Sequence, residues 1–373
     1  MKTLRTALSV FALAAAASCM AQSSNVPTMK SHFKDKFLIG AAIPVGHING
    51  RDHIADSIVK LHYNSIVAEN CMKCEKIHPT KDFYYWKDAD RFVDYGVEND
   101  MAIIGHCLVW HSQLAPWFPF DDSGNFVSAD ELKSRLRDHI TTIVTRYKGK
   151  IHGWDVVNEA IEDDGSYRRS PFYLIMGEEF IPFAFQVAHE ADPDAELYIN
   201  DFSMALPKKR EAYLRIIKDL KDRGIRIDGI GMQSHVGMDY PNLKEYEKSI
   251  KAFGDAGVDV MITELDLSAL PTIKQGANVA DRFRLRDSFN PYKNGLPENA
   301  SRKWNSRMAK IFDIYKRNSD KISRITFWGT HDGMSWRNNW PMFGRTDYPL
   351  PFDRKGNMKP FMVEEISNTK TPN

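Results

Sequence analysis

Cysteine and net charge are what this sequence largely lacks. The 373 residues include four cysteines, and 50 lysines and arginines almost balance 49 aspartates and glutamates. A chain without a basic excess has little to hold a phosphate backbone, so we expect no nucleic-acid partner. Beyond residue 21, no apolar run is long enough to span a bilayer. With 43% hydrophobic and 12% aromatic residues, the chain nevertheless has ample material for one large core.

Motifs for nucleotide, metal or serine-nucleophile chemistry are also missing. There is no phosphate-binding loop, dinucleotide fingerprint or nucleophile elbow. The pair Cys71-x-x-Cys74 has no second such pair and no histidine pair at zinc spacing. Once Cys19 is assigned to the N-terminal segment, an odd number of cysteines remains, which excludes a fully paired disulfide framework. We expect no metal and no cofactor, and either unpaired buried thiols or one disulfide.

The N-terminus predicts export. Lys2 and Arg5 precede an apolar segment over residues 7–17, which has the length of a signal peptide and is too short for a membrane span. Cleavage after Ala21 would send the protein to the periplasm or out of the cell. Lipoprotein anchoring at Cys19 is an alternative, disfavoured because Ala16 stands where a large apolar residue is usual.

Apolar runs alternate with segments of helical period along the rest of the chain. Continuous apolar runs are typical of strands buried on both faces, and eight of them alternating with helices predict an α/β fold, a (β/α)8 TIM barrel. We assign residues 1–21 to the signal peptide, 22–32 to a flexible lead-in, 33–367 to a single barrel domain and 368–373 to a tail. The expected strands are 37–43, 65–70, 102–110, 152–159, 196–201, 229–234, 258–267 and 324–330. The expected helices are 53–61, 88–99, 129–147, 172–191, 207–223, 243–256 and 302–318.

Polar residues stand near the C-terminal ends of these strands. In a barrel the strand ends converge on one face, where active sites are built. Two glutamates, Glu159 and Glu264, each end an apolar run, and Asp266 follows Glu264 by two residues. A buried strand-end carboxylate needs partners or a function. Structural salt bridges are the alternative for each alone, but two together indicate the acid and nucleophile that cleave a glycosidic bond.

Tryptophans and hydrogen-bonding side chains surround these carboxylates in the sequence. The segments around Trp110 and Trp328 mix aromatic rings with polar groups, as a sugar requires flat surfaces for its C–H faces and donors for its hydroxyls. Packing in the core is the alternative for any single one. His235 would hydrogen-bond Glu264 and bridge to Asp266 in such a barrel. A long loop over residues 268–300 follows the strand that carries Glu264, and long loops in compact folds are usually functional.

With these motifs in place, the sequence resembles the family 10 glycoside hydrolases, the endo-β-1,4-xylanases. The resemblance runs in order over roughly residues 33–365 and rests on the segments 63–70, 106–118, 154–159, 198–202, 229–235, 262–267, 290–297 and 326–336. It implies hydrolysis of internal bonds of xylan with retention of configuration. The implied partners are xylan and xylo-oligosaccharides, with no protein partner and a monomeric state.

The resemblance also implies residue roles. Glu159 matches the acid/base and Glu264 the nucleophile, while Asp266 and His235 match the pair that sets the ionisation of the nucleophile. Further residues are implied in substrate binding: Glu69, Asn70 and Lys73 at the sugar two units to the non-reducing side, and His106, Trp110, Asn158, Gln233, Trp328 and Trp336 around the cleavage position. Gln113 and His235 are also expected to bind substrate, without an assigned position. Cysteines at 71, 74 and 107, and Ser203, depart from the family pattern.

Two other functions fit parts of the pattern. Another retaining barrel glycosidase, such as a β-mannanase or a cellulase, shares the two glutamates but would differ at Glu69, Asn70, Lys73 and His106. A non-catalytic glycan-binding barrel would have no need of two strand-end carboxylates. Release of reducing sugar from xylan separates all three.

Overall fold

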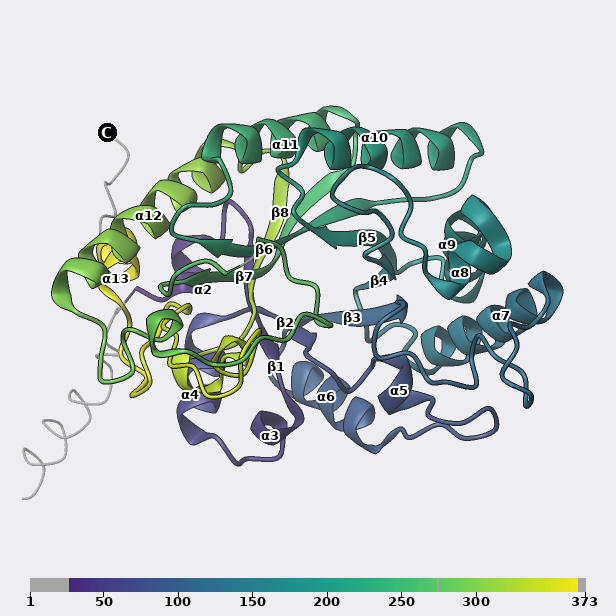
Figure 1. The fold of residues 1–373 in the computed structure, drawn as a ribbon, viewed down its shortest axis with the longest axis horizontal. Coiled ribbons are helices and arrows are strands. Elements are labelled where there is room, and N and C mark those ends of the chain that lie inside the picture. Colours follow the sequence, from purple (N-terminus) through teal and green to yellow (C-terminus); the bar gives the residue numbers. More distant parts are fainter. Residues whose placement is uncertain (1–26, 274, 368–373) are drawn as a thin grey trace, which may run out of the picture.

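A closed barrel of eight parallel strands, in the order β1 to β8, forms the centre of the protein in a computed structural model that describes residues 27–273 and 275–367. Each strand pairs with the next, and β8 pairs with β1 (Figure 1). The predicted α/β barrel is therefore confirmed. The strands are β1 Leu38–Ile43, β2 Ser65–Ala68, β3 Ala102–Val109, β4 Gly153–Asn158, β5 Glu196–Phe202, β6 Gly229–Gly237, β7 Asp259–Ser268 and β8 Ile322–Phe327.

Helices lie around the outside of this barrel (Figure 1). Side chains at their N-termini set where several begin: Asp52 accepts from the backbone N–H of Ala55, and Ser128 from that of Glu131. The helices are α2 Met29–His32, α3 Val45–Ile48, α4 His53–His62, α5 Cys74–Ile77, α6 Lys87–Glu98, α7 Ala129–Arg146, α8 Pro171–Met176, α9 Phe180–Ala191, α10 Pro207–Asp222, α11 Leu243–Asp255, α12 Glu298–Arg317 and α13 Pro360–Ser367.

The structure corrects two expectations. The helix expected over residues 172–191 is two helices, because Gly177 adopts a left-handed φ of 63° that an α-helix cannot continue. The lead-in expected over residues 22–32 is ordered at its end. There, the Thr28 side chain caps α2 and Met29 is fully buried in the core. The signal peptide, the first part of the lead-in and the tail lie outside the described residues.

Two apolar layers hold the barrel. The larger lies between the strands and the outer helices, and a smaller cluster fills the barrel interior. Trp328, directly after β8, belongs to the inner cluster and closes it toward the C-terminal ends of the strands. The barrel is therefore a packed core rather than a pore, and its C-terminal face is left as the platform for a site. Among the described residues, no helix is both long and apolar enough to cross a membrane.

Candidate active site

The candidate residues gather in one cavity at the C-terminal ends of the strands. This cavity, of about 150 Å³, is lined by every candidate site residue except Asp266, together with Ala277 and Val279 from the loop after β7. A second cavity of about 350 Å³ shares Gln233 and His235 with the first, so the two cavities are neighbours. The candidate residues are Glu69, Asn70, Lys73, His106, Trp110, Gln113, Asn158, Glu159, Gln233, His235, Glu264, Trp328 and Trp336.

Both glutamates have an unusual backbone. Glu159 and Glu264 each have a φ of 57°, in the left-handed region that costs a non-glycine residue about 1–2 kcal/mol. At Glu264 the cause is a bulge: Gln233 pairs with Thr263, yet His235 pairs with Asp266, so β7 has an extra residue. Such strain persists only where surrounding contacts hold it, and it concentrates at functional sites.

Glu264 is held as an ionised carboxylate. Its Oε2 lies 3.0 Å from Nε2 of His235, and its Oε1 accepts a 2.9 Å hydrogen bond from the Asn200 amide. Burial alone would raise its pKa, but these hydrogen bonds and the electrostatic effects of the neighbouring histidines outweigh burial and lower it below the ordinary 4.5. A carboxylate kept ionised at this position is a ready nucleophile.

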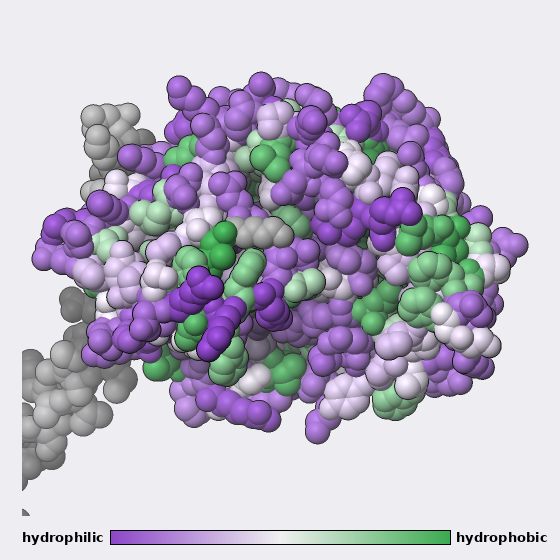
Figure 2. Space-filling view, in the orientation of Figure 1, coloured by the Kyte–Doolittle hydropathy of each residue, from purple (hydrophilic) through white to green (hydrophobic). Residues whose placement is uncertain are grey.

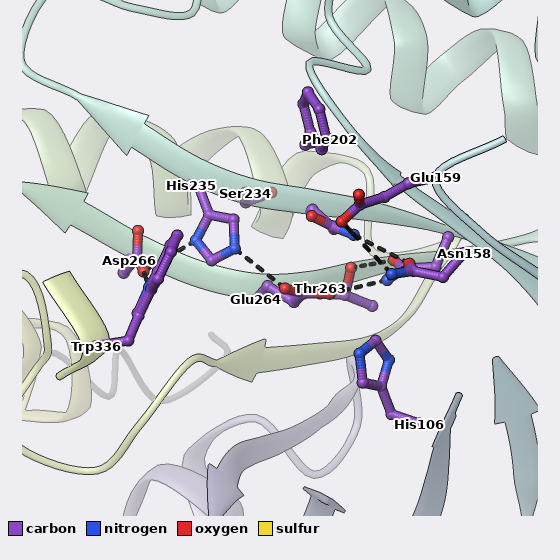
Figure 3. Close-up of polar contacts among 12 residues, drawn as sticks. His106, Asn158, Glu159, Phe202, Ser234, His235, Thr263, Glu264, Asp266 and Trp336 are labelled. Atoms are coloured by element: carbon purple, nitrogen blue, oxygen red, sulfur yellow. Dashed lines mark hydrogen bonds and ion pairs between the residues drawn. The ribbon is translucent and has the colours of Figure 1, made fainter. Parts of the chain in front are cut away.

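His235 is itself kept protonated by a buried partner. In Figure 3 its ring lies between Glu264 and Asp266, and its Nδ1 is 2.9 Å from Oδ2 of Asp266. Burial would lower the pKa of His235, but Asp266 and then Glu264 outweigh burial and raise it to about 9. Asp266 in turn accepts from the Trp336 indole at 2.8 Å and from the Arg337 guanidinium at 2.5 Å. The predicted link from Glu264 through His235 to Asp266 is confirmed.

Glu159 has the opposite protonation preference. It is almost fully buried, and its carboxyl group accepts from the Gln233 amide at 3.3 Å; no cationic side chain within residues 27–273 and 275–367 is bonded to that group. Burial, and next the negative charge of Asp201, raise its pKa from 4.5 to about 7. Its backbone is fixed separately, because Arg168 donates to its carbonyl oxygen at 2.8 Å. At neutral pH a substantial fraction of Glu159 can therefore donate a proton.

One wall of the cavity is a polar cluster from the segments that follow β2 and β3. The Lys73 ammonium donates to Asn70 at 3.1 Å and to Gln113 at 3.0 Å, and lies 4.7 Å from the centre of the Trp110 ring. Burial raises the pKa of Glu69, although the Lys73 charge opposes this. The cluster presents fixed donors and acceptors beside an aromatic face, the combination that a sugar requires.

Several residues that hold the site were given no role from the sequence. Asn200 bonds Glu264, and Asp201 acts on the pKa of Glu159 while its own carboxylate contacts Lys209 at 2.8 Å and the Tyr213 hydroxyl. Both stand near the C-terminal end of β5, and this position could have indicated from the sequence that they belong to the site. Arg337 had no such signal, since it follows β8 by ten residues and reaches Asp266 only through the fold.

The cysteines do not form a site. Cys71, Cys74 and Cys107 are buried and free, which contradicts the alternative of a disulfide among them. Burial raises the pKa of the Cys71 and Cys74 thiols to about 12, so both are protonated. In the part of the chain that the structure describes, no group of three or more His, Cys, Asp or Glu side chains is arranged to hold a metal ion.

A (β/α)8 barrel with an ionised and a protonatable glutamate at its strand ends, lined by tryptophans, defines a glycoside hydrolase. The model of glycosyl hydrolase family 10 matches residues 28–367, and the chain belongs to this family. An endo-1,4-β-xylanase A of Xylanibacter ruminicola is 49% identical over 348 residues, covering 93% of this chain and 94% of the relative. A β-1,4-xylanase of Dictyoglomus thermophilum is 39% identical, covering 91% and 90%. A solved family 10 endoxylanase from a sugarcane soil metagenome superimposes with a TM-score of 0.88 at 43% identity, covering 91% of this chain and 99% of that structure.

Proposed function

We propose that the protein is an endo-1,4-β-xylanase that hydrolyses internal β-1,4-xylosidic bonds of xylan with retention of configuration. The observation that carries this proposal is the opposite protonation preference of Glu159 and Glu264 in one cavity. Two carboxyl groups whose environments drive their pKa values apart are an acid and a nucleophile. The family membership and the names of the relatives support xylan as the substrate.

The reaction proceeds in two displacements. Glu159 donates its proton to the glycosidic oxygen while the Glu264 carboxylate attacks the anomeric carbon, which forms a covalent glycosyl–enzyme and releases the leaving chain. Glu159, now ionised, takes a proton from water, which attacks the anomeric carbon and frees Glu264. Two inversions at the same carbon retain its configuration. His235 and Asp266 keep Glu264 ionised between turnovers.

The remaining cavity residues bind the chain. Glu69, Asn70 and Lys73 hold the sugar two units to the non-reducing side of the cut, and Gln113 fixes the lysine through their 3.0 Å contact. The sugar at the cleavage position is surrounded by His106, Trp110, Asn158, Gln233, Trp328 and Trp336. The Nδ1 of His106 is 2.8 Å from Asp155, which leaves Nε2 for a sugar hydroxyl.

We further propose that the protein works outside the cytoplasm as a monomer without a cofactor. A polysaccharide is too large to enter a cell intact, and the N-terminal sequence has the character of an export signal. Size measurement and N-terminal sequencing of the mature protein test this part.

The decisive experiment follows the anomeric signals of the products by proton NMR during hydrolysis of a xylo-oligosaccharide. We expect the β-anomer first and the α-anomer only after mutarotation; an initial α-anomer would contradict the two-displacement mechanism. In parallel, xylan, mannan and cellulose are compared as substrates. Faster release from mannan or cellulose would favour the other barrel glycosidases, and release from none would favour a binding protein. A rapid loss of xylan viscosity relative to reducing-end release tests internal cleavage.

A further inference from the structure

Residues 282–286, in the loop between β7 and α12, alternate arginine with large apolar side chains. The order is Arg282, Phe283, Arg284, Leu285 and Arg286, and all five are exposed. Phe343, in the loop after β8, is 81% exposed. Gly344, next to Phe343, lies beside the side chain of Leu285, so the two loops meet here. Exposed apolar side chains gathered on one surface, as Phe283, Leu285 and Phe343 are, indicate a contact surface.

This segment belongs to a loop that also supplies part of the lining of the catalytic cavity. Val279, a few residues earlier in the same loop, lines that cavity. The backbone N–H of Phe283 donates to the carbonyl of Pro341 at 2.9 Å, which joins the loops after β7 and β8. Next to Pro341, the Trp340 ring stacks at 4.5 Å on Trp336, which also lines the cavity. Figure 2 shows hydrophobic and hydrophilic side chains intermingled over these two loops.

The arginines differ in what they contact. The Arg282 guanidinium donates to the backbone carbonyls of Val279 and Asp281, so it braces the loop. Among the described residues, by contrast, Arg284 and Arg286 form no ion pair. The next acidic residue along the chain, Asp287, lies 3.5 Å from the ammonium of Lys293. Two exposed guanidinium groups therefore remain without a carboxylate.

We propose that Arg284, Arg286 and Phe343 form a binding site for the uronic-acid side groups of acidic xylan. A guanidinium group binds a carboxylate through two parallel hydrogen bonds, and an aromatic ring packs on the C–H face of a sugar. A neutral xylose backbone supplies no anion for these arginines, whereas a glucuronic-acid branch supplies one next to a sugar ring. The proposal rests on the proposed function and adds that the enzyme prefers glucuronoxylan.

The test compares glucuronoxylan with the same polymer after its carboxyl groups are reduced to alcohols, so that only the charge differs. At low ionic strength we expect the wild-type enzyme to have a higher kcat/KM on the acidic polymer. Each exposed guanidinium–carboxylate contact should contribute about two- to fivefold. The ratio of kcat/KM on the acidic polymer to that on the reduced polymer should fall toward one near 1 M salt, where the screening length is about 3 Å.

Variants separate the proposed site from general charge. Arg284→Gln with Arg286→Gln should remove most of the preference and leave kcat/KM on the reduced polymer unchanged. Lys293→Gln, which removes one exposed positive charge in the same loop, should leave the preference intact. Phe343→Ala should lower kcat/KM on both decorated polymers by a similar factor, because it removes a surface rather than a charge.

The proposal is overturned if the wild-type enzyme shows no preference for the acidic polymer, or if the double arginine variant keeps the preference. If the double variant and Lys293→Gln lose the preference for the acidic polymer equally, the preference is an effect of net charge and the proposal is overturned. Slower migration of the enzyme in native gels that contain either the acidic or the reduced polymer compares its binding to the two polymers without turnover. Failure to hydrolyse undecorated xylan would refute the proposed function, while the gel comparison would still decide whether the arginines bind uronic acids.

Discussion

The pH dependence of activity should be set on its alkaline side by Glu159. A raised pKa keeps the carboxyl group protonated to higher pH, so activity should be lost as pH rises through about 7 rather than through the ordinary 4.5. This difference corresponds to about 3 kcal/mol in favour of the protonated form, at 1.36 kcal/mol per pH unit. The acidic side should lie below 4.5, where Glu264 becomes protonated. The profile of kcat/KM on an aryl xylobioside measures both sides, because this parameter reports the free enzyme.

The structure identifies a substitution that should move only the alkaline side of the pH profile of kcat/KM. After burial, the negative charge of Asp201 is the largest cause of the raised Glu159 pKa, and it does not rank among the main causes for Glu264. Asp201→Asn should therefore lower the pKa of Glu159 by about one unit. The alkaline limb should shift to lower pH by that amount while the acidic limb stays in place. Near pH 7 the variant should accordingly be less active than the wild type.

Two controls make the result interpretable. Asp201 also pairs with the buried Lys209, so circular dichroism and urea unfolding must establish that the variant is folded at the assay temperature. Glu159→Ala, assayed on a substrate whose leaving group needs no protonation, should lose the alkaline limb altogether. If the limb persists in Glu159→Ala, or if Asp201→Asn leaves it where it was in a folded enzyme, the assignment of the acid is refuted.

Three further outcomes are expected. Replacing Trp336 by alanine should lower the ratio of kcat/KM on aryl xylobioside to that on aryl cellobioside. Under the proposed function the indole would close the space that the C6 hydroxymethyl of glucose needs, and excluding a group of that size is worth about 1–3 kcal/mol; an unchanged ratio would refute this steric account. Arg337→Met leaves Asp266 buried without its guanidinium partner and should lower the free energy of unfolding by about 3–5 kcal/mol, measured by urea titration. A loss under about 1 kcal/mol would mean that His235 and Trp336 are enough to stabilise the buried carboxylate. Cys71→Ser should keep most of the activity, and the thiols of the folded enzyme should react with a thiol reagent only on unfolding; stoichiometric bound zinc or rapid labelling would contradict this.

The barrel was predictable because its signals are local. Each strand is a short, largely apolar run, and each of the longer helices has its own period, so the alternation is visible without knowledge of contacts. The break at Gly177 was missed since the apolar period continues through it, and only the left-handed backbone of that residue divides the helix. The α2 helix at Met29 was missed because four residues are too few to display a period.

The sequence by itself determined that one carboxylate directly follows β4 and another stands in the C-terminal half of β7, together with the aromatic and polar side chains that accompany them. It did not determine their protonation, and their separate roles came from family resemblance. Only the tertiary structure decided the protonation of the two glutamates. It brings Asp201 near Glu159 and places His235 against Glu264, with Arg337 bonded to Asp266. The physical reason is that a pKa depends on burial and on charges within a few ångströms. Those charges come from β5, β6 and the loop after β8, which are distant in sequence and meet only when the barrel closes.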